Sequence, residues 1–105
     1  MIITKSTPFT KAEVRRKNKI AIESLSMDLL RVALGYHRGS IKMADRFSQE
    51  ALKRIGEIHK EATEPYFTVI LNKLQKVLLK KEEDRIAEDA LMYSVLCRNY
   101  AKKYT

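Results

Sequence analysis

A single apolar stripe between residues 25 and 62 constrains the fold of this chain more than any other feature. Its members are three or four residues apart throughout, at Leu25, Leu29, Val32, Tyr36, Ser40, Met43, Phe47, Ala51, Ile55, Ile58 and Ala62. The ten steps cover 37 residues, an average of 3.7, which is close to the roughly 3.6 residues per turn of an α-helix. A second apolar row beside the stripe makes this face broad, so it must be buried against other helices or a partner chain. The pattern predicts a helical protein.

Two segments decide how many helices there are. Gly35 can close one helix and Ser40 can cap the next, while Pro65 suits the first turn of a third helix. We therefore predict an all-α, up-down four-helix bundle with helices at about 11–35, 40–61, 65–81 and 85–103. The stripe keeps its phase through residues 35–40, so the alternative is a long helical hairpin that dimerises into a four-helix bundle. In that hairpin Gly35 and Gly39 permit close approach of another backbone.

The start of the ordered region is marked by Thr10. With Glu13 three positions later it forms the pattern of a capping box, whereas residues 1–9 show no helical period. We expect a flexible arm at 1–9 and a single helical domain at 10–105. The chain contains three Gly and two Pro, too few for the turns that a β-sheet protein of this length needs.

The cysteine and histidine content leaves little room for a metal or a disulfide. Cys97 is the only cysteine, so we expect a buried thiol in a reducing compartment. His37 and His59 are 22 residues apart, about 33 Å along one helix, so one ion could not contact both. We expect no metal and no cofactor. Because we find no signal peptide and no apolar run of about 20 residues, we also expect a cytoplasmic protein with no membrane partner.

The strongest charge feature is a basic run near the start of the first predicted helix. The chain carries a formal net charge of +8, which favours polyanionic partners such as nucleic acid. Five of its cations lie within nine residues: Lys11, Arg15, Arg16, Lys17 and Lys19. On a helix Lys11, Arg15 and Lys19 share one row and can follow phosphates. No aromatic residue lies between these cations, which argues against stacking on single-stranded bases.

One short segment resembles a catalytic signature. Arg31 and His37, in the sequence Arg-Val-Ala-Leu-Gly-Tyr-His, fit the R-x4-6-H pattern of HEPN domains, which are small helical bundles that include metal-independent ribonucleases. The resemblance covers seven residues, and Val32 stands where the family usually has a polar residue. It implies that Arg31 holds a scissile phosphate and that His37 transfers a proton.

The broad stripe remains the feature that best indicates a function. We expect a small basic interaction or scaffold module, not an enzyme, that associates with a second copy of itself. The residues expected in the self-association surface or core are Leu29, Val32, Tyr36, Met43, Phe47 and Ile55. A nucleic-acid-binding module that uses residues 11–19 is the alternative, and a HEPN-like ribonuclease is the second alternative.

Overall fold

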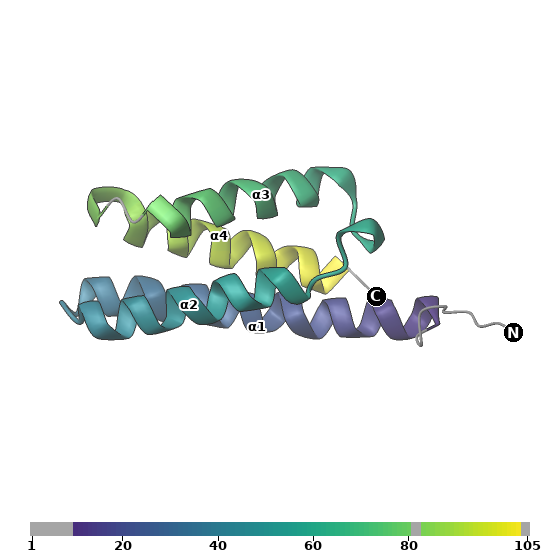
Figure 1. The fold of residues 1–105 in the computed structure, drawn as a ribbon, viewed down its shortest axis with the longest axis horizontal. Coiled ribbons are helices and arrows are strands. Elements are labelled where there is room, and N and C mark those ends of the chain that lie inside the picture. Colours follow the sequence, from purple (N-terminus) through teal and green to yellow (C-terminus); the bar gives the residue numbers. More distant parts are fainter. Residues whose placement is uncertain (1–9, 81–82, 104–105) are drawn as a thin grey trace, which may run out of the picture.

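The structure, a computed structural model, describes residues 10–80 and 83–103. Within these residues the chain forms four α-helices: α1 (Lys11–His37), α2 (Ile41–Glu57), α3 (Pro65–Lys80) and α4 (Glu83–Lys103). A short 3₁₀-helix, η1 (Lys60–Ala62), lies between α2 and α3. Successive helices run in opposite directions (Figure 1), which confirms the predicted all-α, up-down bundle. The arm predicted at 1–9 lies outside the described residues.

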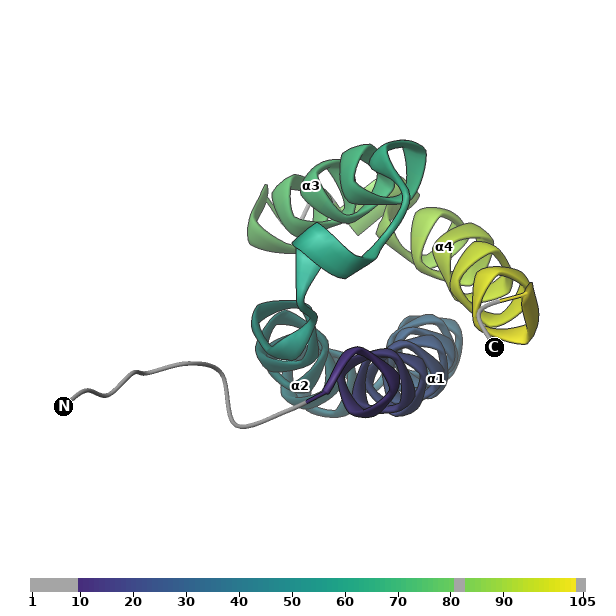
Figure 2. The same cartoon turned by 90° about the vertical axis from the view of Figure 1, so that its right-hand side faces the viewer.

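The four helices are not equivalent in how closely they pack. Seen from the end, α1 lies between α2 and α4, and α3 covers the opposite side (Figure 2). Backbones approach closely along α1–α2 and α1–α4 and much less along α3. The reason is side-chain size, because Gly35 of α1 meets Ala44 of α2. The side chains that α3 buries are large: Phe67, Leu71, Leu74 and Leu78.

Two serines cross-link α1 to α4. The Ser26 hydroxyl donates to the Ser94 carbonyl at 2.9 Å, and the Ser94 hydroxyl donates to the Ser26 carbonyl, also at 2.9 Å. Each buried hydroxyl is thereby satisfied without separating the helices. This reciprocal pair fixes the axial register of α1 against α4.

The first helix begins as predicted and ends later than predicted. The Thr10 hydroxyl accepts from the Glu13 N–H at 3.1 Å, and the Thr10 N–H donates to the Glu13 carboxylate at 2.8 Å. This confirms the capping box. At the other end α1 continues through Gly35 to His37, so the predicted end at residue 35 is wrong. The residue that takes the left-handed conformation is Gly39, with φ of 74°. Ser40 then caps α2 by accepting from the Met43 N–H at 3.3 Å.

The second helix is shorter than the predicted range of 40–61. It ends at Glu57, and the chain is extended at Ile58 before η1 begins. The backbone of His59 is instead bonded by the buried side chain of Asn18: the His59 N–H donates to Oδ1 and the His59 carbonyl accepts from Nδ2, both at 2.9 Å. This tertiary pairing takes the place of the helical hydrogen bonds, which the local sequence could not reveal.

The last two helices lie close to their predicted ranges. Pro65 opens α3 as expected, and the last described residue of that helix is Lys80. The predicted end at residue 81 falls outside the described residues. The fourth helix begins at Glu83, two residues before the predicted start at 85, and ends at Lys103 as predicted.

The predicted stripe lies largely in the chain's own core. Because the chain reverses at residues 38–40, the two halves of the stripe face one another within one molecule. Leu29, Val32 and Ile55 are fully buried. The other three residues expected in the self-association surface or core are half-buried, namely Tyr36, Met43 and Phe47. The predicted break between two helices is therefore confirmed, and the long continuous helix of the alternative hairpin is not formed.

Candidate interaction surfaces

The predicted ribonuclease pair is not brought together. On the continuous helix α1, residues six apart differ in direction by about 240°. Arg31 lies on the α2 side of α1, because its guanidinium is 5.3 Å from the ring centroid of Phe47 of α2. Its Nη1 also lies 3.4 Å from Oδ1 of Asp28, one turn earlier in α1. His37 lies on the other side of α1 and lines a groove against α4. The Arg31 and His37 side chains therefore point to different sides of α1.

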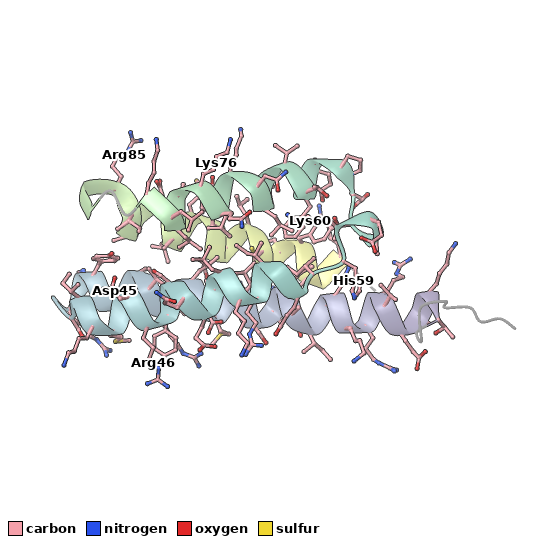
Figure 3. The ribbon with its side chains drawn as sticks, viewed as in Figure 1. Asp45, Arg46, His59, Lys60, Lys76 and Arg85 are labelled. Carbon is pink, nitrogen blue, oxygen red and sulfur yellow. The ribbon has the colours of Figure 1, made fainter. Side chains whose placement is uncertain are left out.

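Arg31 belongs to an ionic cluster along the α1–α2 seam. Asp28 is buried and lies 3.7 Å from Arg54 Nε, and Arg54 Nη1 is 3.1 Å from the Glu57 carboxylate. Burial raises the pKa of the Asp28 carboxyl despite the neighbouring Arg54 and Arg31. On the outer side of the seam, Arg46 of α2 lies over the Phe47 ring at 5.4 Å (Figure 3). The Asp28–Arg54 ion pair and the contact of Arg31 with Phe47 join the two helices.

The described residues offer no centre for metal or thiol chemistry. In residues 10–80 and 83–103, no group of three or more His, Cys, Asp or Glu side chains is placed to hold a metal ion. Burial raises the pKa of the Cys97 thiol to about 12, so the nucleophilic thiolate is scarce at neutral pH. Among the helices of the described ranges, none is long and apolar enough to cross a bilayer.

The predicted basic run forms a surface at one end of the bundle, which we call the basic segment (Lys11, Arg15, Arg16, Lys17 and Lys19). The first turns of α1 project past the ends of the neighbouring helices (Figure 1). The cations of the segment are exposed except Lys19, which is half-buried. They point to different sides of α1. Arg15 lines a hollow of about 390 Å³ with Lys103 of α4, and Lys17 lines another of about 360 Å³ with His59.

A second surface, which the stripe did not indicate, lies on α4. We define the α4 face as four apolar side chains that are exposed by 49, 48, 38 and 37%, respectively: Leu91, Met92, Val95 and Leu96. Their spacing places them together over two turns of one helix. A groove of about 240 Å³ runs beside the face between α4 and α1, lined in part by Leu30, Leu34 and Leu91. The groove extends the apolar surface onto α1.

The sequence carried a signal for the α4 face. The eight residues from Ala90 to Cys97 contain no charged side chain, and a helix that is apolar on all sides is normally covered on all sides. In the bundle one side of this segment is buried, the side that carries Ala90, Tyr93, Ser94 and Cys97, and the opposite side is exposed.

The charged side chains next to the apolar residues differ at the two ends of the α4 face. Glu88 is exposed on the N-terminal side of the face, and Arg98 and Lys102 are exposed on the C-terminal side. On the exposed side of α4, Glu88 therefore precedes the apolar residues and two cations follow them, while the exposed Arg85 lies one turn before Glu88.

Comparisons with models of known protein families, with curated proteins and with solved structures find no match to this chain.

Proposed function

We propose that this chain is a non-catalytic interaction module, that its docking surface is the α4 face, and that the partner is a second copy of the same chain. The observation that carries the proposal is the exposure of Leu91, Met92, Val95 and Leu96 side by side on one helix. Single exposed apolar residues are ordinary on a protein surface, but a contiguous apolar patch rimmed by charge is typical of an interaction site.

The charges beside the face favour a second copy as the partner. A two-fold interface requires that one surface complement itself. If two α4 helices pack antiparallel, Glu88 of each chain lies near the basic end of the other, where Arg98 and Lys102 are exposed. The apolar residues then cover one another at the centre. Parallel packing would instead place like charges together at both ends.

The single cysteine supports a reducing compartment as the place of action. Cys97 has no cysteine partner within the chain for a disulfide, and disulfides are rare in cytosolic proteins. We therefore propose that the module acts in the cytoplasm.

The test compares the same substitution, Val to Glu, inside the α4 face and outside it. Val95→Glu places a charge in the α4 face, whereas Val69→Glu places it on α3, where the side chain is 51% exposed. We expect sedimentation equilibrium to show a dimer for the wild type and for Val69→Glu, and a monomer for Val95→Glu. Circular dichroism should show the same helix content in all three, because both sites are exposed.

A polar substitution guards against unfolding by the added charge. Met92→Gln keeps the length of an exposed side chain that is 48% accessible, and we expect it to weaken the dimer without abolishing the fold. A wild-type protein that remains monomeric would overturn the proposal. So would a folded Val95→Glu variant that still dimerises as the wild type does.

A further inference from the structure

The basic segment lies on the part of α1 that projects from the bundle. The remainder of α1 packs against α2 and α4, but its first turns extend beyond the ends of the neighbouring helices (Figure 1). The capping box at Thr10 holds this end in helical form, with hydrogen bonds of 2.8 and 3.1 Å. A lone α-helix has a diameter of about 10–12 Å with its side chains, which the major groove of B-form DNA, about 12 Å wide, admits.

The cations of this projecting helix lie on both of its flanks. Arg15 faces the α4 side and Lys17 faces the α2 side, since each lines the hollow on its own flank. Arg16 lies between them on the exposed side. A helix in a groove has one phosphate backbone on each side, so cations on both flanks can contact both strands.

The acids nearby do not cancel this arrangement. Glu13 is the only acid from residue 11 to residue 19. Hydrogen bonds from the Thr10 backbone and side chain lower the pKa of the Glu13 carboxyl, so it is charged and engaged in the cap. Glu61 and Glu64 line the hollow beside Arg15, together with Lys103. Glu57 lines the hollow beside Lys17, where it is paired with Arg54 at 3.1 Å. The five cations of the basic segment therefore keep this end of the bundle positively charged.

We propose that the projecting N-terminal part of α1 binds duplex DNA by lying in the major groove, with its cations on the two phosphate backbones. A membrane surface is a poorer fit, because the large apolar side chain exposed beside these cations is Ile20 alone within residues 10–20. Duplex RNA is also a poorer fit, since its major groove is deep and narrow. The binding is expected to have little sequence preference, because phosphate contacts carry none.

The experiment compares two variants of equal charge. The triple variant Arg15→Gln, Arg16→Gln, Lys17→Gln removes three cations from the basic segment. The matched variant Lys73→Gln, Lys76→Gln, Lys80→Gln removes three exposed cations from α3, and Lys76 projects from the side of the bundle opposite α1 (Figure 3). Fluorescence anisotropy with a short labelled DNA duplex measures binding at about 50 mM and about 200 mM salt. The same duplex sequence made as RNA is titrated in parallel.

We expect the wild type to bind DNA and to lose affinity steeply with salt. The α1 variant should bind at least about tenfold more weakly at the lower salt concentration, and its slope of log K against log salt should be smaller by about 2–3. The α3 variant should bind within about threefold of the wild type. Circular dichroism of each variant confirms that it is folded.

Several results would overturn the inference. No binding by the wild type at the lower salt concentration would do so, and equal losses in the two folded variants would assign the binding to net charge. Equal or tighter binding to the RNA duplex would exclude insertion into the major groove. None of these results bears on the α4 face, whose test is the oligomeric state.

Discussion

Asn18 shows how one buried side chain can determine where a helix ends. It is fully buried, and its amide makes two hydrogen bonds of 2.9 Å to the backbone of His59, which lies 41 residues away. An amide is suited to this because it donates and accepts on one plane. The pairing holds the segment between α2 and α3 against α1. This contact is not visible in the sequence, where Asn18 is one polar residue among the cations of the basic run.

Replacing Asn18 with Ala should therefore destabilise the protein more than the loss of one ordinary hydrogen bond. We expect the free energy of unfolding to fall by about 2–3 kcal/mol, because both backbone groups of His59 lose their partner. Urea unfolding followed by circular dichroism measures the change. Asn99→Ala, at an exposed position of α4, is the control and should change the free energy by about 0.5 kcal/mol or less. Equal effects of the two substitutions would contradict this role of Asn18.

Asp28 is a buried polar residue whose replacement is expected to raise stability relative to the wild type as the pH rises toward neutral, in contrast to the replacement of Asn18. Burial raises the pKa of its carboxyl above the ordinary value of 3.8, although Arg54 and Arg31 lower it and Glu50 adds to the rise. The folded state thus holds the proton more tightly than the unfolded state does. The contribution of Asp28 to stability therefore falls as pH rises from below 3.8 through the raised pKa.

Asp28→Asn removes this titration while keeping the shape of the side chain. We expect the variant to gain stability relative to the wild type as pH rises from about 3 to about 7, as measured by urea unfolding at each pH. The difference between the two proteins isolates Asp28 from other titrating groups. If the variant instead loses stability relative to the wild type toward neutral pH, the ion pairs with the two arginines outweigh the cost of burial.

At the scale of the helix, the close packing of α1 on α2 depends on Gly35. A Cβ atom at Gly35 would lie 2.7 Å from the Ala44 backbone nitrogen and 3.0 Å from its Cα. Backbone atoms cannot move aside as the end of a flexible side chain can, so the two helices would have to separate.

We expect Gly35→Ala to lower the free energy of unfolding by about 1–3 kcal/mol, the usual cost of overpacking. Gly56→Ala is the matched control, because it lies in α2 with no atom within 4 Å of the added Cβ. That substitution should be neutral or stabilising by up to about 1 kcal/mol, since Ala favours a helix. Thermal unfolding of both variants compares them, and a Gly35→Ala variant as stable as the wild type would contradict the packing argument.

The helices themselves could be predicted where local chemistry determines them. Thr10 with Glu13, Ser40 and Pro65 each mark a helix start through groups a few residues apart, and each acts as expected. The ends of the helices were harder to predict from the sequence. The closing residue is Gly39 instead of Gly35, because a glycine can serve either as a left-handed cap or as a point of close packing. Sequence does not distinguish these two uses.

At the scale of the molecule, periodicity could not tell burial within one chain from burial between two. The stripe from Leu25 to Ile58 has the same spacing whether its two halves meet each other or a partner. The chain reverses at residues 38–40, which places most of the stripe in the core, while the α4 face stays exposed. Arg31 and His37 point to different sides of α1 because α1 continues through Gly35, and the sequence alone did not establish that continuation.

The proposed antiparallel dimer predicts a specific pattern of charge reversal. Glu88→Lys alone and Lys102→Glu alone should each weaken the dimer, because each places like charges at the ends of the α4 face. The double variant restores opposite charges and should recover much of the affinity, as a double-mutant cycle by sedimentation equilibrium would measure. If the double variant is as weak as the sum of the single variants, the two residues do not meet and the antiparallel register is wrong.

The direction of the helices also determines how the molecule responds to force. The N-terminal end of α1 and the C-terminal end of α4 lie at the same end of the bundle (Figure 1). Tension between these ends therefore pulls the two helices apart turn by turn, as in a zip, and does not slide one along the other. The separation reaches the middle of the helix pair at Ser26 of α1 and Ser94 of α4, whose two hydrogen bonds of 2.9 Å must break together. The protein is thus mechanically weak when pulled from that end, even though its core extends along the whole bundle.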